Sequence, residues 1–297
     1  MNILEVVNLS KRYEGFRLGE INLTLPQGYL MGVVGSRGAG KTTFLKALLN
    51  LVRPDTGVVR IFEQETREQS VQGLPPTIGE KVGFTLGGVA PYASRRLSQI
   101  TATTQGFYPK WDEGVYQSWM ARFGLDEKAK LHQLSPADQV KYVLATSLAR
   151  HCGLIVLDDP TRGLEKDEST AMLDLFRELI SAEKCSLVFT TSQIMDVETC
   201  ADYVAYLRRG ELIAYTSVDE FSRSFLLVKG RLRFLTDELE SALHGIRVTE
   251  KGFTGMIKTK DEAFTTGCQI KEPRLEQIMV FLERPESRPR RAHEEAE

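Results

Sequence analysis

The residues with the clearest chemical potential form a glycine-rich segment, GSRGAGKTT, at positions 35–43. The segment fits the pattern G-x-x-x-x-G-K-[ST], follows the apolar run LMGVV and precedes the helix-like sequence KTTFLKALLNLV. Glycines allow the positive φ angles and the close approach that let backbone N–H groups surround an anion. A plain glycine-rich turn is the alternative, but the flanking strand and helix favour a loop that binds a triphosphate.

Each position of this loop has an expected role. Lys41 is expected to neutralise the β and γ phosphates, and Thr42 to bind Mg²⁺ through its hydroxyl group. The N-terminus of the following helix adds a partial positive charge. The residues expected to bind the nucleotide are Gly35, Ser36, Arg37, Gly38, Ala39, Gly40, Lys41, Thr42 and Thr43.

An acidic pair, Asp158 and Asp159, follows the apolar run LIVL. A carboxylate at the end of a buried strand can hold the water shell of Mg²⁺ beside a phosphate-binding loop, which is the role expected for Asp158. Taken alone, an aspartate at this point is equally well explained as a helix cap or turn former. Its combination with the loop at 35–43 favours the metal site and predicts that the two segments face each other.

The elements that must position these residues indicate a doubly wound α/β fold. Residues 1 to about 90 are predicted to form short strands with one helix after the glycine-rich loop. Residues 92–150 are predicted to be helical, with a last helix that starts at Ser135 and carries Val140, Leu144 and Leu148 on one face. Beyond it, LIVLDD and CSLVFT are typical of buried parallel strands and flank the amphipathic sequence STAMLDLFRELISAE.

The length of 297 residues favours one large domain followed by a smaller one. Residues 223–283 change to short strands such as FLLVKG and GFTGMIKTK, followed by a helix that begins near Pro273. The apolar stripe of this helix, expected to pack on the small domain, is Leu275, Ile278, Met279 and Leu282. Residues 284–297 are rich in proline and charge, which predicts a solvated tail.

Composition argues against several classes of function. A formal charge of -2 and a pI near 6.2 make nucleic acid an unexpected partner. The apolar runs fall short of the roughly 20 residues that a membrane-spanning helix needs, and the N-terminus shows no secretory signal, so a cytoplasmic location is expected. The four histidines lack metal-ligand spacing. The scattered cysteines, expected to be reduced structural thiols, are Cys152, Cys185, Cys200 and Cys268.

Three further motifs, LSPADQVKYVLATSLAR, DDPTRGLE and FTTSQIMDVE, stand in this order along the chain. Together with the glycine-rich loop they resemble the ATP-binding cassette subunits of transporters, over residues 1 to about 225. The resemblance implies an α/β P-loop NTPase with a mainly parallel sheet core, an antiparallel β subdomain, a helical subdomain at about 92–150 and a small α+β C-terminal domain. The expected divisions are 1–222 for the nucleotide-binding domain, 223–283 for the small domain and 284–297 for the tail.

The resemblance also implies a function. Such a subunit binds ATP and Mg²⁺, hydrolyses ATP, and lies on the inner face of the membrane against a separate integral-membrane permease. The C-terminal sequence PRLEQIMVFLER resembles cassette subunits of bacterial lantibiotic, bacitracin or multidrug exporters, which implies export of a peptide or drug-like substrate. Cassettes acting on ribosomes or DNA are disfavoured, because neither a second cassette nor a long coiled-coil insertion is visible in the sequence.

A second cassette, in a homodimer or a heterodimer, would complete each ATP site from the opposite side. The residues expected to face the partner cassette's ATP are Ser135, Pro136, Ala137 and Asp138. Tyr13 matches the aromatic residue that stacks on adenine in this family. A tyrosine at a strand end that packs on the sheet would explain Tyr13 as well.

The signature sequence departs from the family pattern, which reads Leu-Ser-Gly-Gly-Gln where this chain has LSPAD. The sequence LSPAD is still suited to start a helix, with Ser135 as the N-cap, Pro136 in the first turn and Asp138 at the acidic third position. For chemistry it is less suitable, because Pro136 has no N–H to donate and Asp138 brings a negative charge close to another anion. A weakened contact with the partner cassette's ATP is expected.

The expected catalytic residues are Lys41, Asp159 and Ser192. Asp159 replaces the family's glutamate with a carboxylate one methylene shorter, and Ser192 replaces the switch histidine with a group that cannot carry charge. Gly87 falls roughly where the family has glutamine or glutamate, and Glu165 where it has aspartate. Slow hydrolysis follows, because a shift of about 1 Å can cost a hundredfold in rate. The alternative function is a regulatory cassette that binds ATP but scarcely hydrolyses it.

Overall fold

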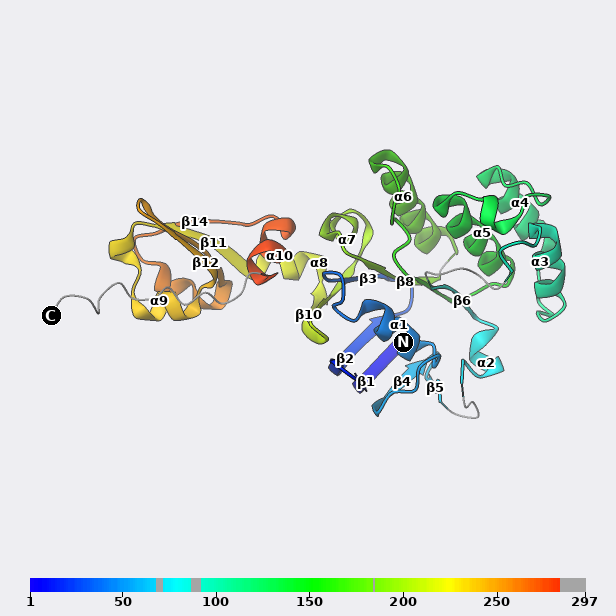
Figure 1. Ribbon diagram of the computed structural model, residues 1–297, viewed down its shortest axis with the longest axis horizontal. Coiled ribbons are helices and arrows are strands. Elements are labelled where there is room, and N and C mark those ends of the chain that lie inside the picture. Colours follow the sequence, from blue (N-terminus) through cyan, green and yellow to red (C-terminus); the bar gives the residue numbers. More distant parts are fainter. Residues whose placement is uncertain (68–71, 87–91, 184, 284–297) are drawn as a thin grey trace. The chain divides into compact units, whose positions relative to one another are not determined.

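The computed structural model describes residues 1–67, 72–86, 92–183 and 185–283 (Figure 1). The chain divides into two compact units, Met1–Tyr215 and Thr216–Glu297. The boundary predicted at residue 222 falls inside helix α8 (Val218–Arg223). Gly87 and the predicted tail at 284–297 lie outside the described residues.

The first unit contains a four-stranded antiparallel sheet with the order β2-β1-β4-β5. Its strands are β1 (Asn2–Tyr13), β2 (Phe16–Pro26), β4 (Thr56–Ile61) and β5 (Gln64–Glu65). With 12 and 11 residues, β1 and β2 are longer than the short strands predicted. The pairing shifts register between Val6 and Leu9, where Asn8 has a φ of 51°. This bulge interrupts the apolar alternation without ending the strand.

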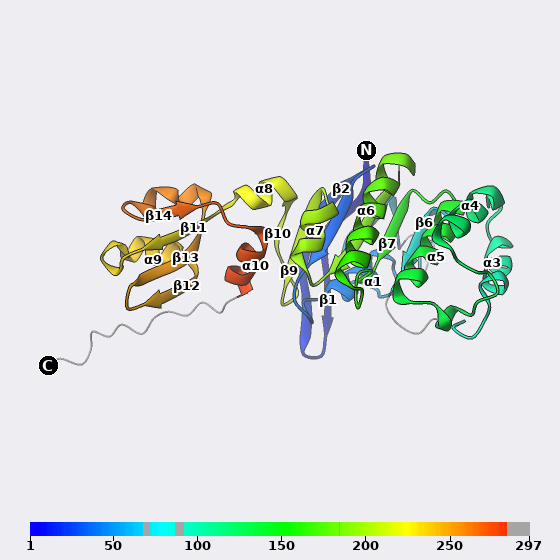
Figure 2. The same cartoon turned by 90° about the horizontal axis from the view of Figure 1, so that it is seen from above.

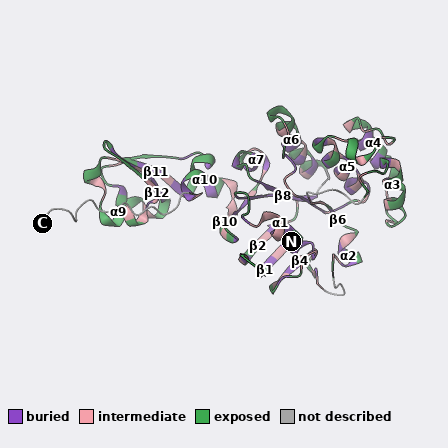
Figure 3. Cartoon of the chain, in the orientation of Figure 1, coloured by how far each residue is buried: buried purple, intermediate pink, exposed green. Residues whose placement is uncertain are grey.

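The second sheet of this unit has six strands in the order β10-β9-β3-β8-β7-β6, and the neighbours from β9 to β6 pair in parallel. Every residue of β3, β7 and β8 is buried (Figure 3), as expected for strands covered on both faces. The strands are β10 (Glu211–Ser217), β9 (Tyr203–Arg208), β3 (Leu30–Val34), β8 (Ser186–Thr191), β7 (Leu154–Leu157) and β6 (Val82–Thr85).

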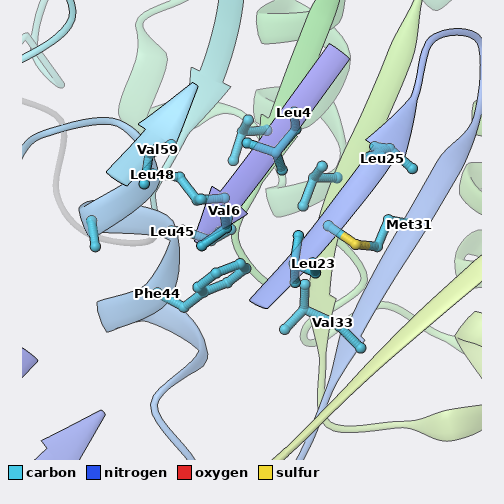
Figure 4. Close-up of a cluster of buried hydrophobic side chains, with 14 of the residues drawn as sticks. Leu4, Val6, Leu23, Leu25, Met31, Val33, Phe44, Leu45, Leu48 and Val59 are labelled. Carbon is cyan, nitrogen blue, oxygen red and sulfur yellow. The ribbon is translucent and has the colours of Figure 1, made fainter. Parts of the chain in front are cut away.

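Helix α1 (Lys41–Leu48) lies on one face of this sheet, and α6 (Lys166–Glu183) and α7 (Ile194–Cys200) lie on the other (Figure 1). Figure 4 shows side chains from β1, β2, β3, β4 and α1 meeting in a single core, which joins the antiparallel sheet to the parallel one. On the opposite face, Gly32 admits α7 closely, because a Cβ at that position would lie 2.6 Å from Val197 Cγ2.

The described residues from 97 to 149, between β6 and β7, form a helical segment (Figure 2). Its helices are α3 (Leu97–Gln105), α4 (Glu113–Phe123) and α5 (Pro136–Ala149), with a short 3₁₀ helix at Leu131–Gln133, and α2 (Pro76–Gly79) precedes β6. The predicted start of α5 is confirmed. The hydroxyl of Ser135 accepts a hydrogen bond of 3.1 Å from the backbone N–H of Asp138, and Pro136 occupies the first turn.

The second unit contains a four-stranded antiparallel sheet with the order β12-β13-β11-β14. Its strands are β11 (Phe225–Gly230), β12 (His244–Thr249), β13 (Gly252–Lys258) and β14 (Gln269–Lys271). Its helices after α8 are α9 (Asp237–Ala242) and α10 (Leu275–Glu283), with short 3₁₀ helices at Leu232–Phe234 and Thr259–Thr265. The predicted apolar stripe of α10 is buried throughout.

All four cysteines lie within the described residues and none forms a disulfide bond, and Cys152, Cys185 and Cys200 are buried. Burial raises the pKa of Cys152 to about 11, so this thiol stays protonated and unreactive near neutral pH. These properties agree with the structural role predicted for the cysteines. Among the described residues, none of the helices combines the length and the apolar content that crossing a membrane requires.

The cap at Ser135 predicts a measurable effect on stability. Ser135→Ala removes the acceptor for the N–H of Asp138 and should lower the free energy of unfolding by about 1 kcal/mol. Ser135→Asp keeps an acceptor and serves as the control. Urea unfolding followed by tryptophan fluorescence tests this, because Trp111 and Trp119 both lie in the helical segment. Equal midpoints for the alanine variant and the wild type would contradict the capping role.

Candidate functional site

The glycine-rich loop connects the end of β3 to the start of α1 and has the conformation that anion binding requires. Gly38 and Gly40 have φ angles of 84° and 103°, in the left-handed region that favours glycine. At Gly35 the constraint is space, because a Cβ there would lie 2.2 Å from the carbonyl oxygen of Leu207. The loop closes with a hydrogen bond of 3.1 Å from Ala39 N–H to Ser36 O. The first N–H groups of α1 therefore open onto the concave side of a preformed loop.

Lys41 is the first residue of α1, and its side chain folds back over the loop. Its Nζ donates hydrogen bonds to the backbone carbonyls of Gly35, at 2.6 Å, and Ser36, at 3.1 Å. These contacts keep the ammonium group inside the loop, where it faces the same concave surface as the N–H groups. The arrangement places a fixed positive charge at the centre of a potential phosphate site.

Asp158 follows β7 and accepts two hydrogen bonds on its two carboxylate oxygens. The hydroxyl of Thr42 donates to Oδ2 at 2.8 Å, and the hydroxyl of Thr190, at the end of β8, donates to Oδ1 at 2.6 Å. Since β3, β8 and β7 are parallel neighbours, their carboxyl ends meet at one edge of the sheet. The predicted meeting of Thr42 and Asp158 is therefore present in the structure.

Asp159 stands next in the chain in a strained conformation, with a φ of 52°. Aspartate tolerates this left-handed region better than most residues with a side chain. Its N–H donates to the hydroxyl of Thr190 at 2.9 Å, which fixes the turn. Burial raises the pKa of the Asp159 carboxyl; the carboxylates of Asp158 and Asp196 add to this rise, and Lys41 and Arg162 oppose it. A carboxyl with a raised pKa is suited to accept a proton.

Ser192 follows β8, on a segment that a buried carboxylate holds in place. The hydroxyl of Thr191 donates to Asp196 Oδ2 at 2.6 Å and accepts the N–H of Gln193 at 3.0 Å. The hydroxyl of Thr161, in the loop after β7, donates to the same oxygen at 2.7 Å. Asp196 thus ties the loop after β7 to the loop after β8.

These segments surround a cavity of about 1020 Å³. Most of the predicted site residues line it, namely Arg37, Gly38, Ala39, Gly40, Lys41, Thr42, Thr43, Pro136, Asp158, Asp159 and Ser192. Gly35, Ser36, Ser135, Ala137 and Asp138 do not belong to the lining. The predicted convergence of the loop and the acidic pair is observed, while the chemical role of each residue stays a prediction.

Two predicted positions have surroundings that the sequence did not indicate. Tyr13 is 42 % exposed, lies outside the lining and has the ammonium of Lys11 5.6 Å from its ring centre. Phe16, its pairing partner across the β1–β2 turn, lines the cavity instead. Asp138 forms an ion pair of 3.2 Å with Lys141, which offsets the negative charge expected to weaken anion binding.

The sequence reasoning missed several residues of the site. Thr190 links Asp158 to Asp159, Asp196 anchors the two loops, and Arg162 and Gln139 line the cavity. The signal for Thr190 is a hydroxyl residue at the end of an apolar run. This signal identifies Thr190 as a site residue only when the order of the strands is known, because β8 must lie beside β7 for the hydroxyl to reach Asp158.

The chain is similar to known proteins over most of this unit. A family model described as ABC transporter matches residues 18–162. The ATP-binding protein EcfA2 of the energy-coupling factor transporter from Enterococcus faecalis is 32 % identical over 68 % of this chain and 72 % of that protein. The ABC transporter ATP-binding protein YtrB from Bacillus subtilis is 24 % identical over 79 % of this chain and 78 % of that protein.

A solved structure has the same fold. The ATP-binding cassette MJ0796, a dimer in a post-hydrolysis state with bound ADP and Pi, superimposes with a TM-score of 0.61 at 21 % identity. The match covers 72 % of this chain and 98 % of that one. The predicted P-loop NTPase fold is thereby confirmed. With its phosphate-binding loop, its acidic strand end and these similarities, the chain belongs to the ATP-binding subunits of ABC transporters.

Proposed function

We propose that this chain binds ATP with Mg²⁺, hydrolyses it slowly, and passes the resulting conformational change to a separate membrane permease. The observation that carries this proposal is the meeting of the glycine-rich loop, Lys41 and the Thr42–Asp158 pair at one wall of the cavity. The loop and Lys41 suit phosphate groups, and the Thr42–Asp158 pair suits the cation that accompanies them.

The donor set of that pair fits Mg²⁺. Thr42 Oγ1 and Asp158 Oδ2 are hard oxygen donors only 2.8 Å apart, close enough to reach one small cation. Thr190 holds the second carboxylate oxygen and so fixes the orientation of Asp158. When bound, Mg²⁺ would neutralise the charge that builds on the β and γ phosphates.

The proposed catalytic group is Asp159, which would accept a proton from the attacking water. Its raised pKa increases its basicity, while its short side chain and fixed turn limit its reach. Ser192 can donate a hydrogen bond to the γ phosphate but adds no charge. Together these features support slow turnover.

A second cassette would complete the proposed site, either as a copy of this chain or as a different subunit. The dimeric cassette MJ0796 supports this arrangement through its shared fold. Ser135, Pro136, Ala137 and Asp138 would then face the ATP of the partner cassette. Pro136 has no N–H to offer, so this contact is expected to be weak.

The proposed task is export of a peptide or drug-like substrate, from the inner face of the cell membrane. The support for export is the resemblance of the sequence PRLEQIMVFLER to cassette subunits of bacterial exporters. Import is the competing direction, since petrobactin import protein FpuD from Bacillus anthracis is 28 % identical over 73 % of this chain and 82 % of that protein.

A regulatory cassette that binds ATP and scarcely hydrolyses it is the second candidate function. Three features favour it: the shortened Asp159, the uncharged Ser192 and the proline in the signature sequence. Brisk turnover of the purified complex, lost on Asp159→Asn, would decide against this candidate.

Replacing Lys41 tests the proposed ATP binding. Lys41→Ala removes the ammonium group at the centre of the loop and should weaken ATP binding by tenfold or more, because charge-assisted hydrogen bonds are lost. Lys46→Ala is the matched control, since Lys46 is exposed on the same helix. Calorimetric titration with Mg·ATP measures the affinity, and substrate uptake by vesicles that contain the assembled complex measures transport. Unchanged uptake in the Lys41 variant would contradict the transport proposal.

The pH dependence of hydrolysis tests the role of Asp159. Only the ionised carboxylate can accept a proton, and burial raises its pKa, so hydrolysis should fall on acidification at a higher pH than an exposed aspartate would give. Asp159→Asn should lower turnover by about a hundredfold or more and remove this acid limb, with ATP affinity retained. Steady-state turnover is measured on both proteins from pH 5 to 9. The ratio of the two rates removes the effect of the titration of ATP itself, which is the same in both experiments. An acid limb that persists in the variant would exclude Asp159 as its source.

A further inference from the structure

Arg162 lines the nucleotide cavity on the same loop as the acidic pair. Its backbone N–H donates to the carbonyl of Asp159 at 3.1 Å, and Gly163 follows with a φ of 77°. The loop thus turns tightly and presents an exposed arginine directly after the group proposed to activate water. Its positive charge opposes the rise in the pKa of Asp159 that burial causes.

Arg162 and Ser192 are held at the wall of the cavity by one buried carboxylate. Each of them follows a threonine, Thr161 or Thr191, whose hydroxyl donates to Oδ2 of Asp196, at 2.7 and 2.6 Å. Asp196 is only 4 % exposed, so both contacts are protected from water. The arginine and the serine therefore lie on two loops that cannot move far apart.

The side of the cavity that holds the acidic pair needs a positive charge, and Arg162 is placed to supply it. Asp158 and Asp159 bring two carboxylates to the place where a γ phosphate would lie, and Ser192 adds no compensating charge. The cations in the described part of the lining are Arg37, Lys41 and Arg162. Arg37 and Lys41 belong to the glycine-rich loop and its helix, whereas Arg162 approaches from the side of Asp159.

We infer that Arg162 supplies the positive charge at the terminal phosphate that Ser192 cannot provide. A guanidinium group suits this role, because it is always charged and can donate two parallel hydrogen bonds to phosphate oxygens. An arginine supplied from the same chain serves nucleotide hydrolysis in other P-loop proteins. The role depends on the ATP binding proposed above.

The ratio of ATP affinity to ADP affinity tests this role without relying on turnover. Arg162→Gln should weaken ATP binding by roughly tenfold and ADP binding by less than about twofold, because only ATP has the terminal phosphate. Arg162→Lys should fall between the wild type and the glutamine variant. Arg177→Gln, an exposed arginine on α6 outside the cavity, is the matched control. Calorimetric titration of the full chain gives the ATP and ADP affinities of all four proteins, and retained ADP binding shows that the variants fold.

Restoring a histidine gives a second, independent result. In the Arg162→Gln background, Ser192→His should recover at least half of the lost preference for ATP, because an imidazole returns a donor and a charge to the same wall. Equal loss of ATP and ADP affinity in Arg162→Gln, or none, would overturn the inference.

A third result separates this role from an effect through Asp159. If Arg162→Gln shifted only the acid limb of hydrolysis and kept the ATP preference, the arginine would act on Asp159 and the inference would fail. The Lys41→Ala titration tests the proposed function separately, so failure of ATP binding itself is distinguishable from failure of the arginine's role.

Discussion

The carboxylate of Asp158 connects three segments that are far apart in the sequence. One oxygen accepts the hydroxyl of Thr42 at the start of α1, and the other accepts the hydroxyl of Thr190 at the end of β8. Hydrogen bonds to a charged acceptor are stronger than neutral ones. The glycine-rich loop, the acidic strand end and the end of β8 are thereby fixed against one another before any ligand enters.

The carboxylate of Asp196 connects separate segments in a similar way. Asp196 joins the loop after β7 to the loop after β8 through Thr161 and Thr191. Both carboxylates depend on the same feature, a parallel sheet whose neighbouring strands end at one edge. Burial raises the pKa of Asp159, and these two neighbouring carboxylates add to the rise. Of the groups that would perform hydrolysis here, Asp159 has a short side chain and Ser192 is uncharged.

Local patterns in the sequence were sufficient to predict the strand, loop and helix around residues 35–43, the buried runs of β7 and β8, and the cap at Ser135. These features depend on neighbours in the chain. The contact of Thr190 with Asp158 and the partners of Asp196 could not be predicted, because they depend on which strands lie side by side. The same limit applies to Phe16 and Tyr13. The path of the β1–β2 hairpin places Phe16 in the lining of the cavity and leaves Tyr13 outside the lining.

The central claim, a cassette that binds ATP well and hydrolyses it slowly because Asp159 is short, is tested most directly by turnover and ATP affinity measured together for the wild type and Asp159→Glu. We expect tight ATP binding by both proteins and a turnover that rises severalfold when the carboxylate gains one methylene, since small displacements of a reacting group change rates strongly. A wild type that already turns over briskly, with no gain from the glutamate, would contradict it.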